Sequence, residues 1–180
     1  MENKTPFMSE IPEKEPQRQQ YFMAHAKEQL HILEENLGRP LTCCINTFGC
    51  QMNARDSEKL LGILETIGYQ AVETEDADFV LYNTCTVREN ANLRVYGRLG
   101  QLGARKKKHP HMMIALCGCM MQEKEVVEKI KKTYRFVDLI FGTHNIFKLA
   151  ELVSLCLEER LEELEAQGRE DKKPKHKMVV

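Results

Sequence analysis

The stretch "LTCCINTFGCQMN", residues 41–53, sets the expectation for the fold. Its first part, 41–47, is typical of a β-strand, and Gly49 breaks the run just before Cys50. A helix is expected to begin at Asn53, because apolar residues then recur at helical spacing until Gly68. A strand, a turn and a helix in this order indicate one βα unit of an α/β domain.

The same rhythm repeats along the chain. Further strands are expected at residues 69–72, 78–83, 112–117 and 136–142. Helices are expected at about 89–107, around Val126 to Ile130, and from Asn145 to about Gln167. Strands that alternate with helices favour a mainly parallel five-stranded sheet with right-handed crossovers and helices on both faces. We predict a flavodoxin-like (Rossmann-like) α/β fold with strand order 2-1-3-4-5.

The chain divides into four segments by composition. Residues 1–20 are polar and contain three prolines, which predicts a disordered leader. Residues 21–40 form an added N-terminal helix that packs on the domain, because apolar residues line one stripe before Gly38 and Pro40. Residues 41–157 form the α/β domain itself. Residues 158–180 are charged and are expected to leave the domain as a solvated helix end and linker.

Composition limits the classes of function. The 26 basic residues balance 27 acidic ones, so bulk charge does not indicate a nucleic-acid binder and any RNA contact must be local. The sequence has neither an apolar run of the ~20 residues that cross a bilayer nor the apolar core of a signal peptide, which predicts a cytoplasmic protein without membrane contact. Seven cysteines in a reducing compartment do not suggest a disulfide framework. Metal binding, redox chemistry and burial in the core remain as explanations for the seven cysteines.

Three cysteines share one position relative to the predicted strands. Cys50, Cys85 and Cys119 each lie in the loop after a strand, at separations of 35 and 34 residues. In the predicted strand order these three strands are neighbours, so the cysteines meet at the carboxyl edge of the sheet. Soft sulfur ligands select zinc, copper(I) or iron–sulfur clusters. Structural zinc sites usually carry a C-x-x-C knuckle and four ligands, whereas three cysteines on a 4Fe-4S cluster leave one iron open.

The other cysteines have a simpler explanation. Cys43 and Cys44 lie inside the first strand and Cys156 inside a helix, which predicts core packing. In "CGC", Cys119 lies further past its strand than Cys117, so Cys119 is the predicted ligand and Cys117 is expected to be buried.

Several polar and glycine residues near these loops have two possible roles. Four residues either tune a cluster by hydrogen bonds or cap helices and form turns: Asn46, Asn53, Asn83 and Arg88. The basic run 105–111 either contacts phosphates or forms a solvated helix end. Three glycines in the helix at 89–107, Gly97, Gly100 and Gly103, either admit a close backbone or weaken the helix.

Four motifs resemble one enzyme family. The motifs "NTFGCQMNARDSEKL" (46–60), "NTCTVRENA" (83–91), "CGCMMQ" (117–122) and "VDLIFGTHNI" (137–146) are similar to the N-terminal domain of the radical-SAM methylthiotransferases. The resemblance covers about residues 41–151. The "GCQMN" wording resembles the tRNA branch, whose members convert isopentenyl-adenosine beside the anticodon into its 2-methylthio derivative.

The resemblance implies cofactors and partners. Cys50, Cys85 and Cys119 match the three ligands of an auxiliary 4Fe-4S cluster whose open iron binds the sulfur to be transferred. Family members also hold a second 4Fe-4S cluster, on a C-x-x-x-C-x-x-C motif that uses S-adenosylmethionine, and a C-terminal TRAM domain that helps to bind tRNA. This chain contains no such motif. The resemblance therefore implies a transferase domain that is inactive alone and works with radical-SAM and TRAM domains outside this chain.

Three alternatives stay open at this point. The sister branches of the family modify threonylcarbamoyl-adenosine or a ribosomal-protein aspartate. Only the residues "QMN" (51–53) favour the tRNA isopentenyl-adenosine branch over them. A zinc-holding interaction module without chemistry would also use cysteines. A flavodoxin-type redox module is disfavoured, because the first strand-to-helix turn lacks a phosphate loop rich in Ser, Thr and Gly.

Overall fold

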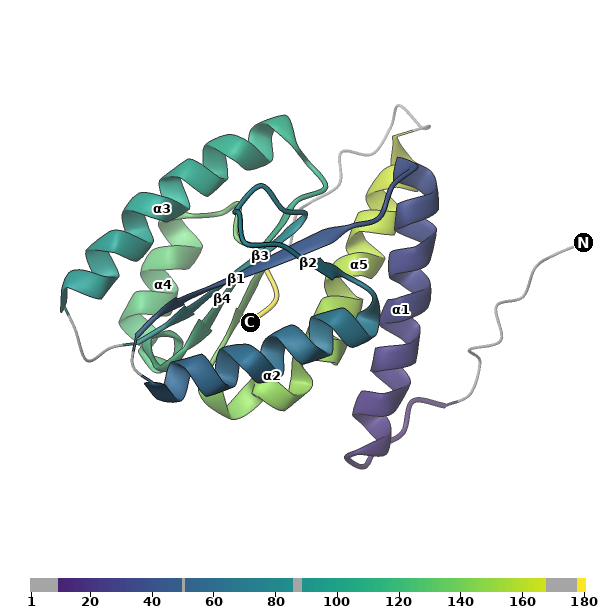
Figure 1. The fold of residues 1–180 in the computed structure, drawn as a ribbon, viewed down its shortest axis with the longest axis horizontal. Helices are drawn as coiled ribbons and strands as arrows, with labels where there is room; N and C mark the ends of the chain where they lie inside the picture. The colour runs from purple at the N-terminus through teal and green to yellow at the C-terminus, as the bar shows by residue number, and fades with distance from the viewer. Residues whose placement is uncertain (1–9, 50, 86–88, 168–177) are drawn as a thin grey trace, which may run out of the picture.

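A single parallel sheet forms the centre of the protein (Figure 1). The computed structural model describes residues 10–49, 51–85, 89–167 and 178–180. The strands are β1 (Thr42–Phe48), β2 (Gln70–Ala71), β3 (Phe79–Thr84), β4 (Met113–Gly118) and β5 (Leu139–Phe141). They pair in parallel in the order β2-β1-β3-β4-β5, which confirms the predicted topology.

Helices cover both faces of the sheet. One face carries α2 (Gln51–Ile67) and α5 (Leu149–Ala166), with α1 (Gln17–Leu37) packed alongside α5. The other face carries α3 (Glu89–Lys108) and α4 (Lys124–Thr133). Two short 3-10 segments, η1 (Cys119–Gln122) and η2 (Thr143–Lys148), follow β4 and β5. None of the helices in the described part of the chain is both long and apolar enough to cross a membrane.

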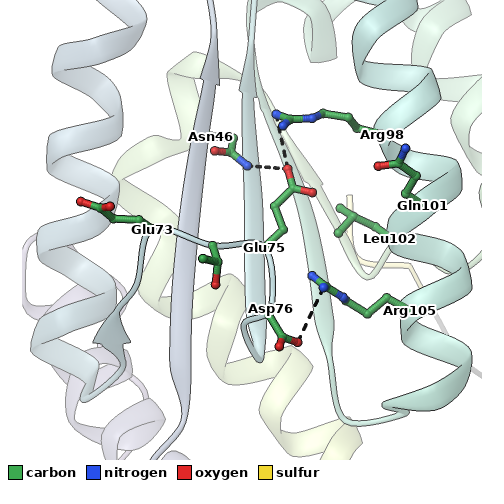
Figure 2. Close-up of a pocket in the computed structure, with 9 residues that line it drawn as sticks. Asn46, Glu73, Glu75, Asp76, Arg98, Gln101, Leu102 and Arg105 are labelled. Atoms are coloured by element: carbon green, nitrogen blue, oxygen red, sulfur yellow. Dashed lines mark hydrogen bonds and ion pairs between the residues drawn. The ribbon is translucent and has the colours of Figure 1, made fainter.

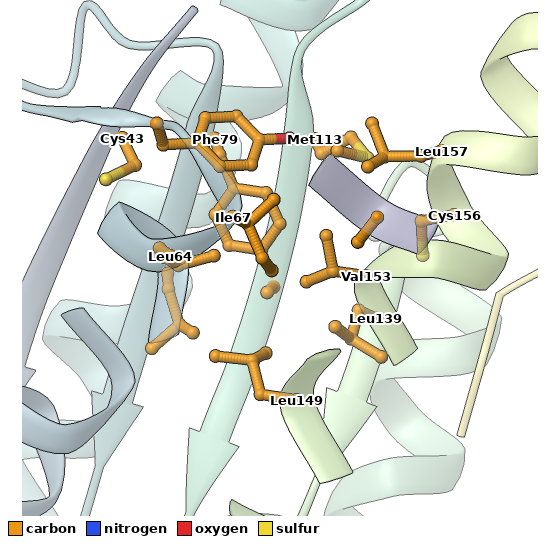
Figure 3. Packing of buried hydrophobic residues seen from close by; sticks show 14 of the residues in the cluster. Cys43, Leu64, Ile67, Phe79, Met113, Leu139, Leu149, Val153, Cys156 and Leu157 are labelled. Carbon is orange, nitrogen blue, oxygen red and sulfur yellow. The ribbon is translucent and has the colours of Figure 1, made fainter. Parts of the chain in front are cut away.

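Two hydrophobic clusters, one on each face of the sheet, explain why the central strands are rich in apolar residues. Cys43 belongs to the cluster on the α2 and α5 side, which also contains Leu64, Phe79 and Val153 (Figure 3). Its neighbour Cys44 belongs to the cluster on the α3 and α4 side. Every residue of β3 and β4 is buried, as expected for central strands of a parallel sheet that is covered on both faces.

Element boundaries differ from the sequence prediction in places. α1 begins at Gln17 rather than Tyr21, directly after Pro16, which needs no backbone N–H partner at a helix start. The guanidinium of Arg18 also donates hydrogen bonds to the Glu151 carboxylate on α5. The edge strands β2 and β5 are shorter than predicted, and α5 begins at Leu149 because η2 occupies the residues before it.

The region after residue 157 also differs from the predicted solvated helix and linker. Arg160 is only 4% exposed, and its guanidinium donates to the buried Asp138 carboxylate beside β5. Val179 pairs with Leu139 in a parallel bridge, so this part of the chain packs on the edge of the sheet. Residues 168–177 lie outside the described residues.

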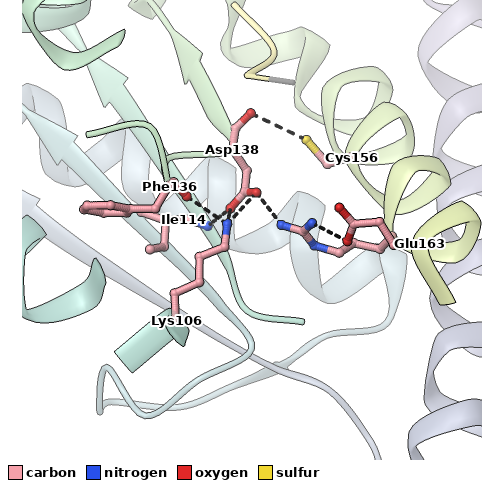
Figure 4. Close-up of polar contacts among 7 residues, drawn as sticks. Lys106, Ile114, Phe136, Asp138, Cys156 and Glu163 are labelled. Atoms are coloured by element: carbon pink, nitrogen blue, oxygen red, sulfur yellow. Dashed lines mark hydrogen bonds and ion pairs between the residues drawn. The ribbon is translucent and has the colours of Figure 1, made fainter. Parts of the chain in front are cut away.

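Asp138 is the centre of a buried polar network (Figure 4). Lys106 Nζ donates to both carboxylate oxygens, at 2.6 Å and 2.5 Å, and the Ile114 backbone N–H donates at 2.7 Å. Burial lowers the pKa of Lys106, although the carboxylate opposes this shift. One interpretation of the basic run 105–111 is a solvated helix end. At Lys106 this interpretation is wrong, because the lysine is buried in an ion pair with Asp138 that joins α3 to the start of β5.

Candidate functional site

The loops that follow β1, β3 and β4 meet at the carboxyl edge of the sheet. An added Cβ at Gly49 would lie 2.7 Å from Cys85 Cβ, which is closer than side chains approach. Gly118 has a φ of 112°, and a Cβ there would lie 2.0 Å from the Thr84 carbonyl oxygen. The β3 loop is therefore held between the residue before Cys50 and the residue before Cys119, and both positions require glycine.

Two of the three predicted ligands, Cys85 and Cys119, lie next to Thr84. Cys85 follows Thr84 directly and is 4% exposed. Cys119 is the first residue of η1, is partly exposed, and its thiol lies 3.7 Å from the Thr84 carbonyl oxygen, measured from Sγ. Cys50 lies outside the described residues, but Gly49 before it lies so close to the Cys85 side chain that an added Cβ would not fit. Within the described ranges alone, three metal-ligating side chains do not come together.

Two asparagines join the first turn of α2 to the end of β3 by hydrogen bonds. Asn53 is 5% exposed, and its amide nitrogen lies 3.2 Å from both the Asn83 side-chain oxygen and the Thr84 carbonyl oxygen. The Asn83 amide donates in return to the Asn53 carbonyl at 2.8 Å and to Ser57 Oγ at 3.0 Å. The helix begins at Gln51, so Asn53 does not begin it as predicted. The Asn53 side chain instead holds α2 against β3 through these hydrogen bonds.

Thr84 and Ser57 are site-supporting residues that the sequence interpretation missed. Thr84 Oγ1 donates to the Cys117 carbonyl at 2.9 Å and ties β3 to β4. Its own carbonyl accepts from Asn53 and Cys119. Backbone acceptors leave no residue-type signal in a sequence, so only the geometry identifies this role. Arg88, the fourth polar residue predicted near the loops, lies outside the described residues.

The remaining cysteines are buried away from solvent, as predicted. Cys43, Cys44, Cys117 and Cys156 are at most 3% exposed. Burial raises the pKa of Cys43 to about 12, with smaller contributions from nearby charges, so its thiol stays protonated at neutral pH. Cys117 lies inside β4, and its side chain is completely buried. Burial alone does not distinguish them from Cys85, which is 4% exposed, whereas Cys119 is partly exposed.

Asn46, also predicted to lie near the cysteine loops, has other hydrogen-bond partners than Asn53 and Asn83. Its amide donates to Glu75 Oε1 at 2.6 Å, and the same carboxylate oxygen lies 3.4 Å from Arg98 (Figure 2). This oxygen also accepts a hydrogen bond from Tyr82 OH at 2.9 Å. Asn46, Glu75 and Arg98 line a hollow of about 490 Å³ between β1, residues 73–76 and α3. The Asn46 side chain thus bonds to this acidic segment.

Comparisons with known proteins agree on one family. Residues 42–142 match the model described as "Uncharacterized protein family UPF0004". The chain is 72% identical over 131 residues to a "tRNA-2-methylthio-N(6)-dimethylallyladenosine synthase" of Lachnoclostridium phytofermentans, covering 73% of this chain and 29% of that protein. It is 53% identical over 144 residues to a protein of the same name from Acetivibrio thermocellus, covering 79% and 30%. The chain therefore spans about 30% of the length of these relatives.

Proposed function

Because the chain belongs to the UPF0004 family, we propose that it is the N-terminal cluster-binding domain of a tRNA methylthiotransferase. The proposed enzyme adds a methylthio group to isopentenyl-adenosine (dimethylallyl-adenosine) next to the anticodon. The names of the similar proteins support this substrate over the sister substrates. A tRNA-modifying enzyme of this kind works in the cytoplasm.

Cys50, Cys85 and Cys119 are the proposed ligands of a 4Fe-4S cluster. The donor set fits such a group, because thiolates are the soft ligands that iron–sulfur clusters take, and Gly49 and Gly118, the residues before Cys50 and Cys119, both lie close to the end of β3 that carries Cys85. When bound, the cluster supplies an iron position that the cysteines leave open for the sulfur to be transferred. We assign the second cluster and S-adenosylmethionine to the part of the relatives' length that this chain does not cover.

One observation carries the ligand assignment. The backbone contacts at Gly49 and Gly118 bring the loops that hold the three cysteines against the end of β3. At both glycines a single added methyl group would overlap a neighbouring residue. Loops that only connected strands to helices would not need such close packing. The close contacts therefore support a built site at this edge.

The surrounding residues hold the ligand loops in place. Asn53, Asn83 and Thr84 make hydrogen bonds between α2, β3 and β4, with Asn83 and Thr84 fully buried. A ligand set needs such support because each thiolate must stay at a fixed position while sulfur is delivered and consumed. We assign these three residues a positioning role.

A chimaeric enzyme tests the proposed function. This chain would replace the matching N-terminal region of the Lachnoclostridium relative, and the chimaera would be expressed in a bacterial strain that lacks the corresponding enzyme. Mass spectrometry of digested tRNA should detect the 2-methylthio derivative of isopentenyl-adenosine. Separate Ala substitutions of Cys50, Cys85 and Cys119 should abolish the product, whereas Cys43→Ser should not. A chimaera that retains its product after all three Ala substitutions would contradict the proposal.

A further inference from the structure

A second hollow lies beside the proposed cluster site. It measures about 490 Å³ and is lined by Phe48 from β1 and by five residues of α3: Leu93, Arg94, Gly97, Arg98 and Gln101. We call it the Phe48 hollow. Phe48 stands two residues before Cys50, so the hollow opens next to the first ligand loop. Arg98 and Gln101 also line the acidic hollow of Figure 2, which makes the two hollows neighbours.

The α3 wall of the Phe48 hollow is basic. Two arginines, Arg94 and Arg98, line the hollow, and none of the described residues that line it is acidic. Arg94 and Arg98 are exposed and lie one helical turn apart on the side of the hollow. Glu75 lies 3.4 Å from Arg98 and offsets part of its charge. The local excess is therefore cationic, as an anionic ligand requires.

The floor of the hollow offers an aromatic surface. Phe48 is partly exposed, and its ring and the Tyr82 ring meet edge to face with centroids 5.0 Å apart. The Arg98 guanidinium carbon lies 5.6 Å from the centroid of the Phe48 ring. Unpaired nucleobases stack on aromatic rings and on guanidinium planes, and this pair offers both.

Gly97 opens the helix wall to a ligand. Among the described residues, no atom lies within 4 Å of a Cβ added at Gly97, so packing inside this part of the chain does not require a glycine there. A glycine in a helix interior costs about 1 kcal/mol relative to alanine. Its side of the helix faces the Phe48 hollow between Arg94 and Arg98, where a missing side chain allows closer approach.

We propose that the Phe48 hollow binds a single-stranded segment of RNA, with a base on the Phe48 ring and phosphates on Arg94 and Arg98. The inference rests on the proposed function, since a tRNA substrate brings unpaired anticodon-loop nucleotides to this edge of the sheet. The strand runs over α3 rather than over residues 73–76, where Glu73, Glu75 and Asp76 repel phosphate. The hollow thus holds RNA beside the end of β1, which leads into the loop of Cys50.

Fluorescence anisotropy with a labelled anticodon stem-loop RNA tests this assignment on the 180-residue chain. Arg94→Glu with Arg98→Glu should weaken binding by about tenfold at low salt. Loss of two phosphate contacts should also reduce the slope of log affinity against log salt by about 1.4. The matched control is Lys124→Glu with Lys132→Glu, which makes the same charge change at exposed positions of α4 and should bind as the unchanged chain does.

Substitutions of Phe48 separate stacking from charge. Phe48→Leu keeps an apolar residue but removes the ring, and it should weaken binding at least about fivefold. Phe48→Trp should bind at least as well as the unchanged chain. Circular dichroism of both variants checks that β1 still folds.

The outcomes distinguish this inference from the proposed function. A chain that holds iron and sulfide but binds RNA equally well without the two arginines overturns the inference alone. Equal loss in the α4 control overturns it too, because the binding is then general electrostatic attraction. A chain that holds no iron and sulfide after reconstitution overturns the proposed function, whatever its affinity for RNA.

Discussion

Replacing Gly118 by alanine should damage both the fold and the proposed cluster site. The residue has a φ of 112°, a backbone conformation that costs a non-glycine residue of the order of 1–3 kcal/mol. The new methyl group would also lie 2.0 Å from the Thr84 carbonyl oxygen and 2.7 Å from its backbone nitrogen. Relief of this overlap must move the backbone of β3 or η1, and overpacking of this kind typically costs about 1–3 kcal/mol.

The two contributions together predict a loss of about 2–6 kcal/mol in the free energy of unfolding, out of a typical total of about 5–15. Urea unfolding followed by circular dichroism measures this loss. Anaerobic reconstitution should also give less iron per chain, because η1 begins with Cys119. The matched control is Gly100→Ala, where no described atom lies within 4 Å of the new group, and it should raise stability by up to about 1 kcal/mol. If Gly118→Ala unfolds at the same urea concentration as the unchanged chain and keeps its iron, the inferred loop contact is wrong.

Three further predictions concern the core and its ion pairs. Asp138→Asn should lower the free energy of unfolding by about 3–5 kcal/mol, because it leaves Lys106 buried without its carboxylate and Arg160 with Glu163 alone. Asp76→Asn at an exposed pair should change it by less than about 0.5 kcal/mol, and equal urea midpoints for the two variants would disprove the network. Although burial alone would raise it, hydrogen bonds from Arg39 and Thr42 hold the pKa of Asp78 below its ordinary value of 3.8. The stability contributed by Asp78 is therefore present above about pH 4 and is lost as the pH falls through the lower folded-state pKa, so the difference in unfolding free energy from Asp78→Asn should shrink in acid; a constant difference would contradict this. Cys43→Ser with Cys44→Ser should lower stability but leave the iron content per chain unchanged, as measured by urea unfolding and metal analysis, and loss of iron would show that the core assignment is wrong.

The strand order was predictable because it depends on local patterns. Each βα unit shows a short apolar run and then helical spacing, and right-handed crossovers leave few ways to arrange such units. The meeting of the three loops follows from that order, since the carboxyl ends of adjacent parallel strands share one edge. The predicted sites of Cys43, Cys117 and Cys156 in the core are likewise confirmed.

The features that the sequence did not reveal depend on distant partners. Asn53 has the side chain of a helix-capping residue, but its hydrogen bonds go to residues 30 and 31 positions away. Lys106 and Arg160 look like surface residues until Asp138, 32 and 22 positions away, is placed between them. Patterns along one segment cannot show such pairings, because they form only after the segments have packed.

The chemical content of the reconstituted chain tests the central claim most directly. Anaerobic reconstitution followed by iron, sulfide and zinc analysis should give about four irons and four sulfides per chain. The variant with Ala at Cys50, Cys85 and Cys119 should bind almost none, while the Cys43 and Cys44 variant matches the unchanged chain. Full iron and sulfide in the triple Ala variant, or about one zinc and no sulfide in the unchanged chain, would contradict a cluster held by these three cysteines.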